Sequence, residues 1–186
     1  MGAFSDVLRL LKLKPPKRRH GKGQYWQRRS DLHYYKVVRE WINEQEAGER
    51  IIDVGSQSTP LVLEGNFNRR TMVDIRRFTE KIPGVEQIVS DWMKFKLPEQ
   101  VDLVLCLQVL EHLPDEVVSP FAQKLLSAGK RVIISVPHQW PKGQCRYHLQ
   151  DPVDLAKLVS WTRKEPVRHY IEKRDSKERL IALFEN

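Results

Sequence analysis

The stretch Val101-Asp-Leu-Val-Leu-Cys-Leu107 is almost wholly apolar over the length of one strand. Strands that are buried on both faces of a parallel sheet have this pattern, because neither face is in contact with water. The stretch therefore predicts a strand at the centre of a parallel sheet. Polar residues follow it at once in Gln-Val-Leu-Glu-His-Leu-Pro-Asp115, so side chains capable of chemistry are expected at the carboxyl end of this strand.

Strand-like and helix-like segments alternate on both sides of this central stretch. Short β-branched runs predict further strands at Arg50–Val54, Thr71–Ile75, Glu86–Ser90 and Arg131–Val136. Apolar spacing and punctuation predict helices at Ser30–Ala47, Leu61–Phe67, Arg76–Ile82, Asp115–Ser127 and Asp151–Trp161, with Ser30 or Asp31 as a cap, Gly48 as a stop and Pro152 in a first turn. Val167–Lys173 and Arg179–Phe184 predict an antiparallel hairpin. The alternation indicates an α/β fold with a doubly wound, mostly parallel sheet, to which the hairpin adds a reversed strand at one edge.

The composition is that of a globular chain of ordinary domain size. The 186 residues are 40% hydrophobic and 30% charged, and no apolar run approaches the roughly 18–20 residues that a membrane-spanning helix needs. Two cysteines, Cys106 and Cys145, are too few for a disulfide scaffold. No signal peptide is recognisable, because Leu10 to Leu13 is short and interrupted by Lys12. The sequence therefore predicts a cytoplasmic location.

Positive charge is concentrated near the start of the chain. The net charge is +8, and residues 1–48 account for +6 of it, with 11 Lys and Arg against five Asp and Glu. The rest of the chain is nearly neutral. We therefore predict a basic, partly flexible N-terminal arm at residues 1–29 and a single domain at residues 30–186.

The arm has three possible uses. Apolar residues at helical spacing over residues 4–13 predict peripheral contact with a membrane surface or docking to a partner. A nucleic-acid arm is an alternative, for which Tyr25 and Trp26 would supply stacking surfaces. The third reading is a terminus that is solvated by its own charges.

Each of the first three predicted strands is followed by a carboxylate. The first ends in Asp53-Val-Gly55-Ser-Gln-Ser-Thr, where the glycine allows a sharp turn and a close approach of the backbone to a ligand. Asp74 comes about twenty residues later, where a carboxylate accepts both hydroxyls of a ribose; the alternative is a helix cap. Asp91 and Trp92 offer an acceptor for the amine of an adenine and a flat face beside it; the alternative is a turn aspartate next to a half-buried indole.

With these residues in place, the chain over about residues 30–186 resembles the class I S-adenosylmethionine-dependent methyltransferases, nearest to the small-molecule and sugar methyltransferases. The resemblance rests on Asp53-Val-Gly-Ser, Asp74, Ser90-Asp-Trp92 and above all Val101–Asp115, with its Glu-His-Leu after the fourth strand. It implies a Rossmann-like sheet of seven strands, the last one reversed, and S-adenosyl-L-methionine as the cofactor.

The resemblance also implies roles for individual residues. Asp53 and Gly55 would shape the turn around the methionine part of the cofactor, Asp74 would hold the ribose, and Asp91 with Trp92 would hold the adenine. The cofactor residues that it implies are Asp53, Gly55, Ser56, Gln57, Thr59, Asp74, Ile75, Asp91, Trp92, Cys106, Leu107, Gln108 and His112. The first turn departs from the family pattern, because Gln and Thr stand where the family usually has two further glycines.

Methyl transfer to a hydroxyl is helped by a base that removes its proton, and histidine suits this role near neutral pH. His138 and His148 are the catalytic candidates, since both lie in the irregular segment 137–150 after the fifth predicted strand. No metal site is predicted, because carboxylates and histidines show no ligand spacing along the chain.

The sequence thus predicts a methyltransferase that acts on a small molecule or a sugar or glycan, most readily at oxygen. One alternative is an RNA methyltransferase that uses the basic arm as its electrostatic footprint. The other is a non-catalytic, methyltransferase-like binding module. The acceptor, the methylated atom and the oligomeric state are left open.

Overall fold

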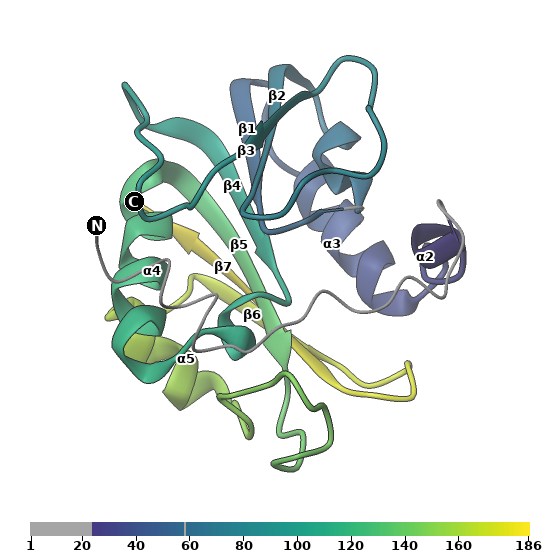
Figure 1. The fold of residues 1–186 in the computed structure, drawn as a ribbon, viewed down its shortest axis with the longest axis vertical. Coiled ribbons are helices and arrows are strands. Elements are labelled where there is room, and N and C mark those ends of the chain that lie inside the picture. The colour runs from purple at the N-terminus through teal and green to yellow at the C-terminus, as the bar shows by residue number, and fades with distance from the viewer. Residues whose placement is uncertain (1–23, 58) are drawn as a thin grey trace.

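Seven strands form one sheet in the computed structural model, which describes residues 24–57 and 59–186 (Figure 1). The order across the sheet is β3-β2-β1-β4-β5-β7-β6. All pairs from β3 to β5 are parallel, and β7 is antiparallel to both of its neighbours. The strands are β1 Gly48–Val54, β2 Phe67–Asp74, β3 Glu86–Val89, β4 Val101–Leu107, β5 Gly129–Pro137, β6 Arg168–Glu172 and β7 Arg179–Glu185. The predicted fold class is confirmed.

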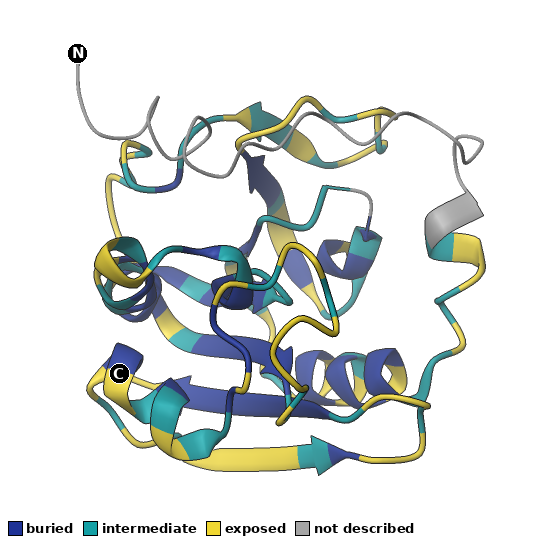
Figure 2. Cartoon of the chain, turned by 60° about the horizontal axis from the view of Figure 1, so that its bottom comes forward, coloured by how far each residue is buried: buried dark blue, intermediate teal, exposed yellow. Residues whose placement is uncertain are grey.

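The apolar strand β4 lies at the centre of the sheet, as predicted, between β1 and β5. Its residues Leu103, Val104, Leu105 and Cys106 are buried, and Figure 2 shows the central strands buried along most of their length. Because parallel strands point the same way, the segments that follow β1, β2, β3, β4 and β5 all leave from one edge of the sheet. We call this the carboxyl edge.

Helices cover both faces of the sheet and enclose two apolar cores (Figure 1). One face is covered by α3, with the 3-10 turn η1 beside it, and the other by α4 and α5. The helices are α2 Gln24–Gln27, α3 His33–Asn43, α4 Asp115–Ala128 and α5 Leu155–Thr162, and the 3-10 turns are η1 Pro60–Leu63 and η2 Leu110–His112. Within the described residues, no helix is both long enough and apolar enough to cross a membrane.

Several predicted helices are shorter than expected or absent. Residues 76–82 contain no helix, because Phe78 and Ile82 are the only large apolar side chains among mostly charged ones and Pro83 follows. In residues 61–67, η1 ends at Leu63 and β2 already begins at Phe67, and Gly65 between them adopts a φ of +70°. The last helix begins at Leu155 and is capped by Asp154, so Pro152 precedes it instead of occupying its first turn.

The terminal hairpin is confirmed, but its reversed strand is not at the edge of the sheet. β7 lies between β5 and β6, so β6 is the edge strand. Residues 180–184 of β7 are all buried, whereas the first three residues of β6 are exposed. β7, which is apolar at residues 180–184, takes the interior position, and β6, with its charged side chains, faces solvent, where it discourages pairing with other chains.

The predicted limits and cap of the first domain helix are wrong. α3 begins after Leu32, ends at Asn43, and no side chain at its N-cap position caps it; Gly48 opens β1. Its first two backbone N–H groups instead donate to the Asp175 carboxylate, from His33 and Tyr34, both at 3.0 Å. The turn between β6 and β7 therefore supplies the cap from a distant part of the chain.

We expect Asp175→Ala to lower the free energy of unfolding by about 1–2 kcal/mol, the usual cost of losing a helix cap. Asp31→Ala is the matched control, because Asp31 is exposed at the same helix end and should cost about 0.5 kcal/mol at most. Urea denaturation of both variants measures the difference. Equal losses would show that Asp175 does not cap α3.

The predicted N-terminal arm lies largely outside the described residues, including the membrane-contact segment 4–13. Trp26 is within them, and its ring packs edge-on against Tyr35 at 5.0 Å with the Arg39 guanidinium 5.3 Å from its centre. Trp26 is therefore half-buried in the packing on α3, and its use as a stacking surface for nucleic acid stays a prediction.

Candidate active site

Three carboxylates line the carboxyl edge, one from each of three neighbouring strands. Asp53 lies near the end of β1, Asp74 ends β2, and Asp91 follows β3. These strands are adjacent in the order β3-β2-β1, with Asp74 opposite Val89 in the register. The three acids, which are far apart in the sequence, therefore lie side by side in a row along this edge.

Asp53 is the most deeply buried of the three. It has no solvent exposure, and neither of its carboxylate oxygens has a hydrogen-bond partner. Burial, followed by the charge of the neighbouring Asp74, raises the pKa of Asp53 well above its usual value. An unpartnered buried carboxylate is costly, so this position indicates a role in binding a donor or a cation.

Asp74 and Asp91 are each held by a local backbone hydrogen bond. Asp74 Oδ1 accepts from the Arg76 N–H at 2.8 Å, and Asp91 Oδ1 accepts from the Met93 N–H at 2.9 Å. Burial raises the pKa of Asp74, and the second oxygen of Asp91 is buried without a partner. Each carboxylate is thus fixed in direction, and Asp91 keeps a buried oxygen for a further donor.

The turn after β1 approaches the segment after β4 closely. Gly55 has a φ of +84°, and its N–H donates to the Val73 carbonyl at 2.8 Å. A Cβ built on Gly55 would lie 2.6 Å from a methyl group of Val109. Gln57 also has a positive φ, of 46°, without being glycine. Of the other predicted turn residues, the Ser56 hydroxyl is buried without a partner and Thr59 is buried.

Two predicted cofactor side chains face the apolar core. Trp92 is 3% exposed and stacks on Phe95 at 5.9 Å, so its indole has no open face for an adenine, which corrects that prediction. Cys106 has no solvent exposure, and burial raises the pKa of its thiol well above the usual value. These two residues can serve a ligand only through their backbone.

The remaining predicted cofactor residues lie at the same edge. Ile75 is 37% exposed, directly after β2. Leu107 ends β4 and is half-buried, and Gln108, with a φ of +58°, donates from its side-chain amide to the Ser135 hydroxyl at 3.3 Å. The strand end is therefore sharply bent towards η2.

η2 carries a buried acid beside a histidine. Glu111 is 1% exposed, and burial raises its pKa to about 8. Burial also lowers the pKa of His112, whose Nδ1 lies 2.9 Å from the Tyr147 carbonyl. The imidazole is thus neutral at pH 7, with its N–H directed at that carbonyl.

The two predicted catalytic histidines have different surroundings. His148 Nδ1 contacts Asp151 Oδ2 at 2.8 Å, and its ring lies 4.8 Å from that of His112. His138 Nδ1 contacts Glu178 Oε2 at 2.9 Å, on the connection between β6 and β7. Each histidine is therefore paired with a carboxylate, and of the two only His148 contacts His112 of η2.

Trp140 connects these two histidines. Its ring stacks on His148 at 5.3 Å with an interplanar angle of 22°, and its indole N–H donates to the Glu178 carbonyl at 2.8 Å. Two cations, Lys177 and Arg179, lie over the same ring, at 4.4 Å and 5.8 Å. The irregular segment after β5 is therefore fixed in place between η2 and the hairpin.

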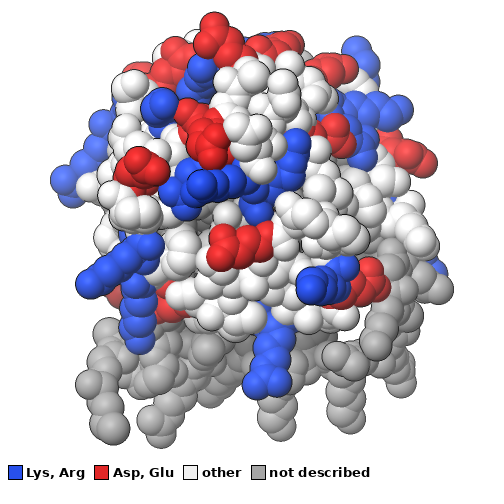
Figure 3. Space-filling view, turned by 90° about the horizontal axis from the view of Figure 1, so that it is seen from above, with Lys and Arg blue, Asp and Glu red and all other residues white. Residues whose placement is uncertain are grey.

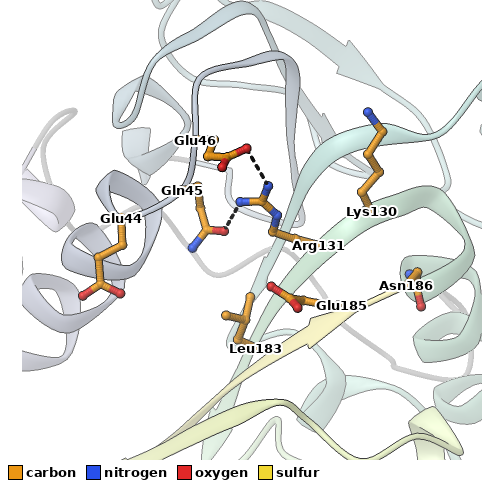
Figure 4. A pocket seen from close by; sticks show the side chains of 8 residues that line it. All are labelled: Glu44, Gln45, Glu46, Lys130, Arg131, Leu183, Glu185 and Asn186. Atoms are coloured by element: carbon orange, nitrogen blue, oxygen red, sulfur yellow. Dashed lines mark hydrogen bonds and ion pairs between the residues drawn. The ribbon is translucent and has the colours of Figure 1, made fainter.

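A polar cavity of about 580 Å³ lies at the opposite edge of the sheet (Figure 4). Arg131 at the start of β5 points across it, donating to Gln45 Oε1 at 2.7 Å and lying 3.9 Å from Glu46 Oε2. Its lining consists of Glu44, Gln45, Glu46, Lys130, Arg131, Leu183, Glu185 and Asn186. The cavity is thus separate from the carboxylates and histidines at the carboxyl edge.

Sequence reasoning missed the partners of these histidines. Glu111, Asp151 and Glu178 are acidic residues beside turns. Solvent-exposed acids commonly occur in the same context, so the sequence does not distinguish these three from them. Glu111 is the glutamate of the Glu-His-Leu stretch, but its position there predicts no separate role for its side chain. Its complete burial is the signal that separates it from a surface glutamate.

The sheet order and the reversed β7 are those of the class I S-adenosylmethionine-dependent methyltransferase fold. The N-methyltransferase NodS of Bradyrhizobium japonicum WM9, solved with S-adenosyl-L-homocysteine, matches with a TM-score of 0.65 and 15% identity, covering 98% of this chain and 97% of that one. The small RNA methyltransferase HEN1 matches with a TM-score of 0.64 and 18% identity, covering 83% of this chain and 25% of that one.

The chain is also similar in sequence to known methyltransferases. It is 29% identical over 140 residues to the ubiquinone biosynthesis O-methyltransferase of Pseudomonas aeruginosa, an alignment that covers 64% of this chain and 60% of that protein. The chain thus spans about 60% of the length of the curated relatives it matches. No protein-family model matches it.

Proposed function

We propose that this chain is an S-adenosylmethionine-dependent methyltransferase that methylates an oxygen of a small molecule or a sugar. The row of carboxylates formed by Asp53, Asp74 and Asp91 carries the proposal, because Asp53 and Asp74 are buried and two of the three have buried oxygens without a partner. The fold of the solved methyltransferases and the sequence similarity to an O-methyltransferase support it.

The residues at the carboxyl edge fit S-adenosylmethionine. When bound, the cofactor supplies a methyl group on a positively charged sulfur. Asp74 would accept from the ribose hydroxyls, and the unpartnered Asp91 Oδ2 would accept from the adenine amine. Asp53 would bring its negative charge towards the cationic methionine end. Gly55 has a positive φ and no Cβ, so the backbone of the turn after β1 can approach the cofactor closely.

The acceptor would lie against the segment that follows β5. A hydroxyl there becomes a better nucleophile when a base takes its proton. His138 and His148 are the candidates, and in each the Nδ1 is held by a carboxylate, so the Nε2 is the nitrogen that would accept the proton. Glu178 and Asp151 would orient these rings and stabilise the imidazolium that forms.

The test is a calorimetric titration with S-adenosylhomocysteine of the wild type and of Asp74→Ala. We expect micromolar binding to the wild type and binding about 10–100-fold weaker in the variant, because hydrogen bonds to a charged acceptor contribute about 1.5–3 kcal/mol. Asp31→Ala, an exposed aspartate outside the row, should bind as the wild type does. Circular dichroism confirms that each variant is folded.

The same titration separates this proposal from a non-catalytic binding module. Folded wild-type protein that gives no heat and no thermal shift with S-adenosylhomocysteine would overturn the enzyme assignment. Equal affinity in the wild type and in Asp74→Ala would instead overturn the assignment of the ribose site to the carboxyl edge.

The RNA methyltransferase alternative receives less support from the described residues. Figure 3 shows one face on which Lys and Arg side chains are interspersed with Asp and Glu, whereas a nucleic-acid footprint requires a continuous basic surface. The predicted basic arm lies mainly in residues 1–23, outside the described residues, so its use stays a prediction of the sequence, as does the cytoplasmic location.

A further inference from the structure

Three side chains that were not expected to meet lie together at the carboxyl edge. Glu111 and His112 come from η2, and His148 comes from the segment after β5. One ligand atom of each lies within 4.8 Å of those of the other two. Two imidazoles and one carboxylate at this separation are a donor set for a divalent metal ion.

Both histidines are oriented as metal ligands usually are. A ligating imidazole commonly donates its other ring N–H to a carbonyl or a carboxylate, which fixes the ring and its tautomer. The Nδ1 of His112 faces the Tyr147 carbonyl at 2.9 Å, and the Nδ1 of His148 faces Asp151 at 2.8 Å. A carbonyl only accepts, so His112 Nδ1 carries the hydrogen and its Nε2 keeps a free lone pair. The Nδ1 of His148 is engaged by Asp151 in the same way, so its Nε2 is the ring nitrogen that is left for a ligand.

The carboxylate of the cluster also has an unused oxygen. Glu111 is 1% exposed and its Oε2 is buried without a partner, while its Oε1 lies 3.9 Å from His112 Nε2. A buried carboxylate oxygen without a donor is a costly arrangement. The charge of Arg179 acts on Glu111, but its guanidinium lies 3.6 Å from Asp175 and over the rings of Tyr34 and Trp140.

The backbone holds the two parts of the cluster together. The carbonyl of Glu111 accepts from the N–H groups of Leu149 and Gln150, at 2.8 Å and 3.2 Å. The Gln150 side chain donates in turn to the Leu113 carbonyl at 2.8 Å. Leu149, the residue after His148, is therefore hydrogen-bonded to η2. The three side chains are thus held near one another before any ion binds.

We propose that Glu111, His112 and His148 form a binding site for a divalent first-row transition ion such as Zn²⁺, Mn²⁺ or Fe²⁺. Imidazole ligands favour these ions over Mg²⁺ and Ca²⁺, which prefer oxygen alone. Around a tetrahedral ion with bonds of ~2.1 Å, the donor atoms would lie roughly 3.4 Å apart. Side-chain rotations that move each donor atom by less than about one ångström would therefore complete the site.

Three protein ligands leave at least one coordination position open, as in catalytic metal sites. An ion with an open position polarises a bound hydroxyl and lowers its pKa. If the proposed methyltransferase function is correct, that position would receive the oxygen of the acceptor. His148 would then be a ligand, leaving His138 as the candidate base.

The test is metal binding by the full, tag-free chain without cofactor. Metal-stripped protein is titrated calorimetrically with ZnCl₂, MnCl₂ and MgCl₂, and CoCl₂ is added as a spectroscopic probe. We expect one Zn²⁺ per chain, little or no Mg²⁺, and visible d–d bands from bound Co²⁺. Glu111→Gln and His148→Asn should each weaken Zn²⁺ binding at least tenfold and abolish the Co²⁺ bands, and His138→Asn, a histidine outside the cluster, should do neither.

Each other outcome overturns the proposal. Folded wild-type protein that binds no ion below millimolar concentration has no such site. Equal binding in the wild type and in the two cluster variants would place the ion elsewhere on the chain. If Glu111→Gln does not fold, His112→Asn tests the same ligand set from a more exposed position. Titration with S-adenosylhomocysteine in the presence of EDTA is independent, so failure of the metal site leaves the cofactor proposal standing.

Discussion

Replacing Asp53 with Asn is expected to stabilise the ligand-free protein at pH 7.5 by about 2–4 kcal/mol, because the buried carboxyl must hold a proton at this pH to avoid an unpaired charge in the interior, whereas an amide is neutral without one. The two side chains have nearly the same shape, so the packing around β1 is retained. The same change should weaken the binding of S-adenosylhomocysteine. Asp53 would then be an example of a residue that is kept for function at the expense of stability.

This stabilisation has a defined dependence on pH. The pKa of Asp53 is raised in the folded protein, so the folded state keeps a proton that the unfolded state releases above pH ~4. Stability of the wild type therefore falls as the pH rises from about 4 towards the folded pKa. In Asp53→Asn this slope disappears, so the two proteins should be nearly equal in stability at pH 4 and diverge above it.

Asp102 provides a control of opposite sign. Its carboxylate accepts from Lys130 Nζ at 2.8 Å and from the N–H groups of Glu49 and Arg50, and the Lys130 hydrogen bond lowers its pKa. Asp102→Asn should destabilise at pH 7.5, and its deficit should shrink as the pH falls through the folded pKa of Asp102. Urea denaturation at pH 3, 4, 6 and 7.5 measures both variants, the lowest pH reaching the range in which Asp102 takes up its proton, and parallel curves for Asp53→Asn and the wild type would contradict the first prediction.

Gly55→Ala is expected to lower the free energy of unfolding by about 2–4 kcal/mol. A φ of +84° costs an alanine about 1–2 kcal/mol, and its Cβ would meet a Val109 methyl group at 2.6 Å. Such overpacking typically adds 1–3 kcal/mol. Because the displaced segment leads into η2, we also expect binding of S-adenosylhomocysteine to weaken.

Gly84→Ala isolates the contribution of the contact with Val109. Gly84 has a φ of +73°, similar to that of Gly55, but nothing lies within 4 Å of a Cβ built there. It should therefore lose only about 1–2 kcal/mol, with cofactor binding unchanged. Thermal and urea unfolding of both variants measure the difference, and equal losses would mean that Val109 moves aside without cost.

The strands could be predicted because each carries its own signal. Val101–Leu107 is apolar throughout, and a strand of that kind is stable only where both faces are covered. The helix predicted at residues 76–82 does not form, because this mostly charged stretch has too small an apolar face to bury. The cap of α3 could not have been predicted at all, since Asp175 reaches it from the other end of the chain.

The candidate site divides in the same way. Asp53, Asp74 and Asp91 were predicted because a parallel sheet converts strand order into neighbouring positions. Trp92 was misassigned, since a residue after a strand can point into the core as easily as into a cleft. The meeting of His148 with Glu111 depends on how a long irregular segment folds back, which its spacing along the sequence does not record.

The hairpin of β6 and β7 also sets the order in which the domain can be completed during synthesis. β7 is the last strand of the sheet to be synthesised; it covers β5, and the turn before it supplies the carboxylate for the first turn of α3. Until then, the nascent chain has an open sheet edge at β5 and a helix start without its acceptor. The first turn of α3 thus depends on the turn that follows β6, so a polypeptide that stops before Asp175 lacks both the cap of α3 and the strand that covers β5.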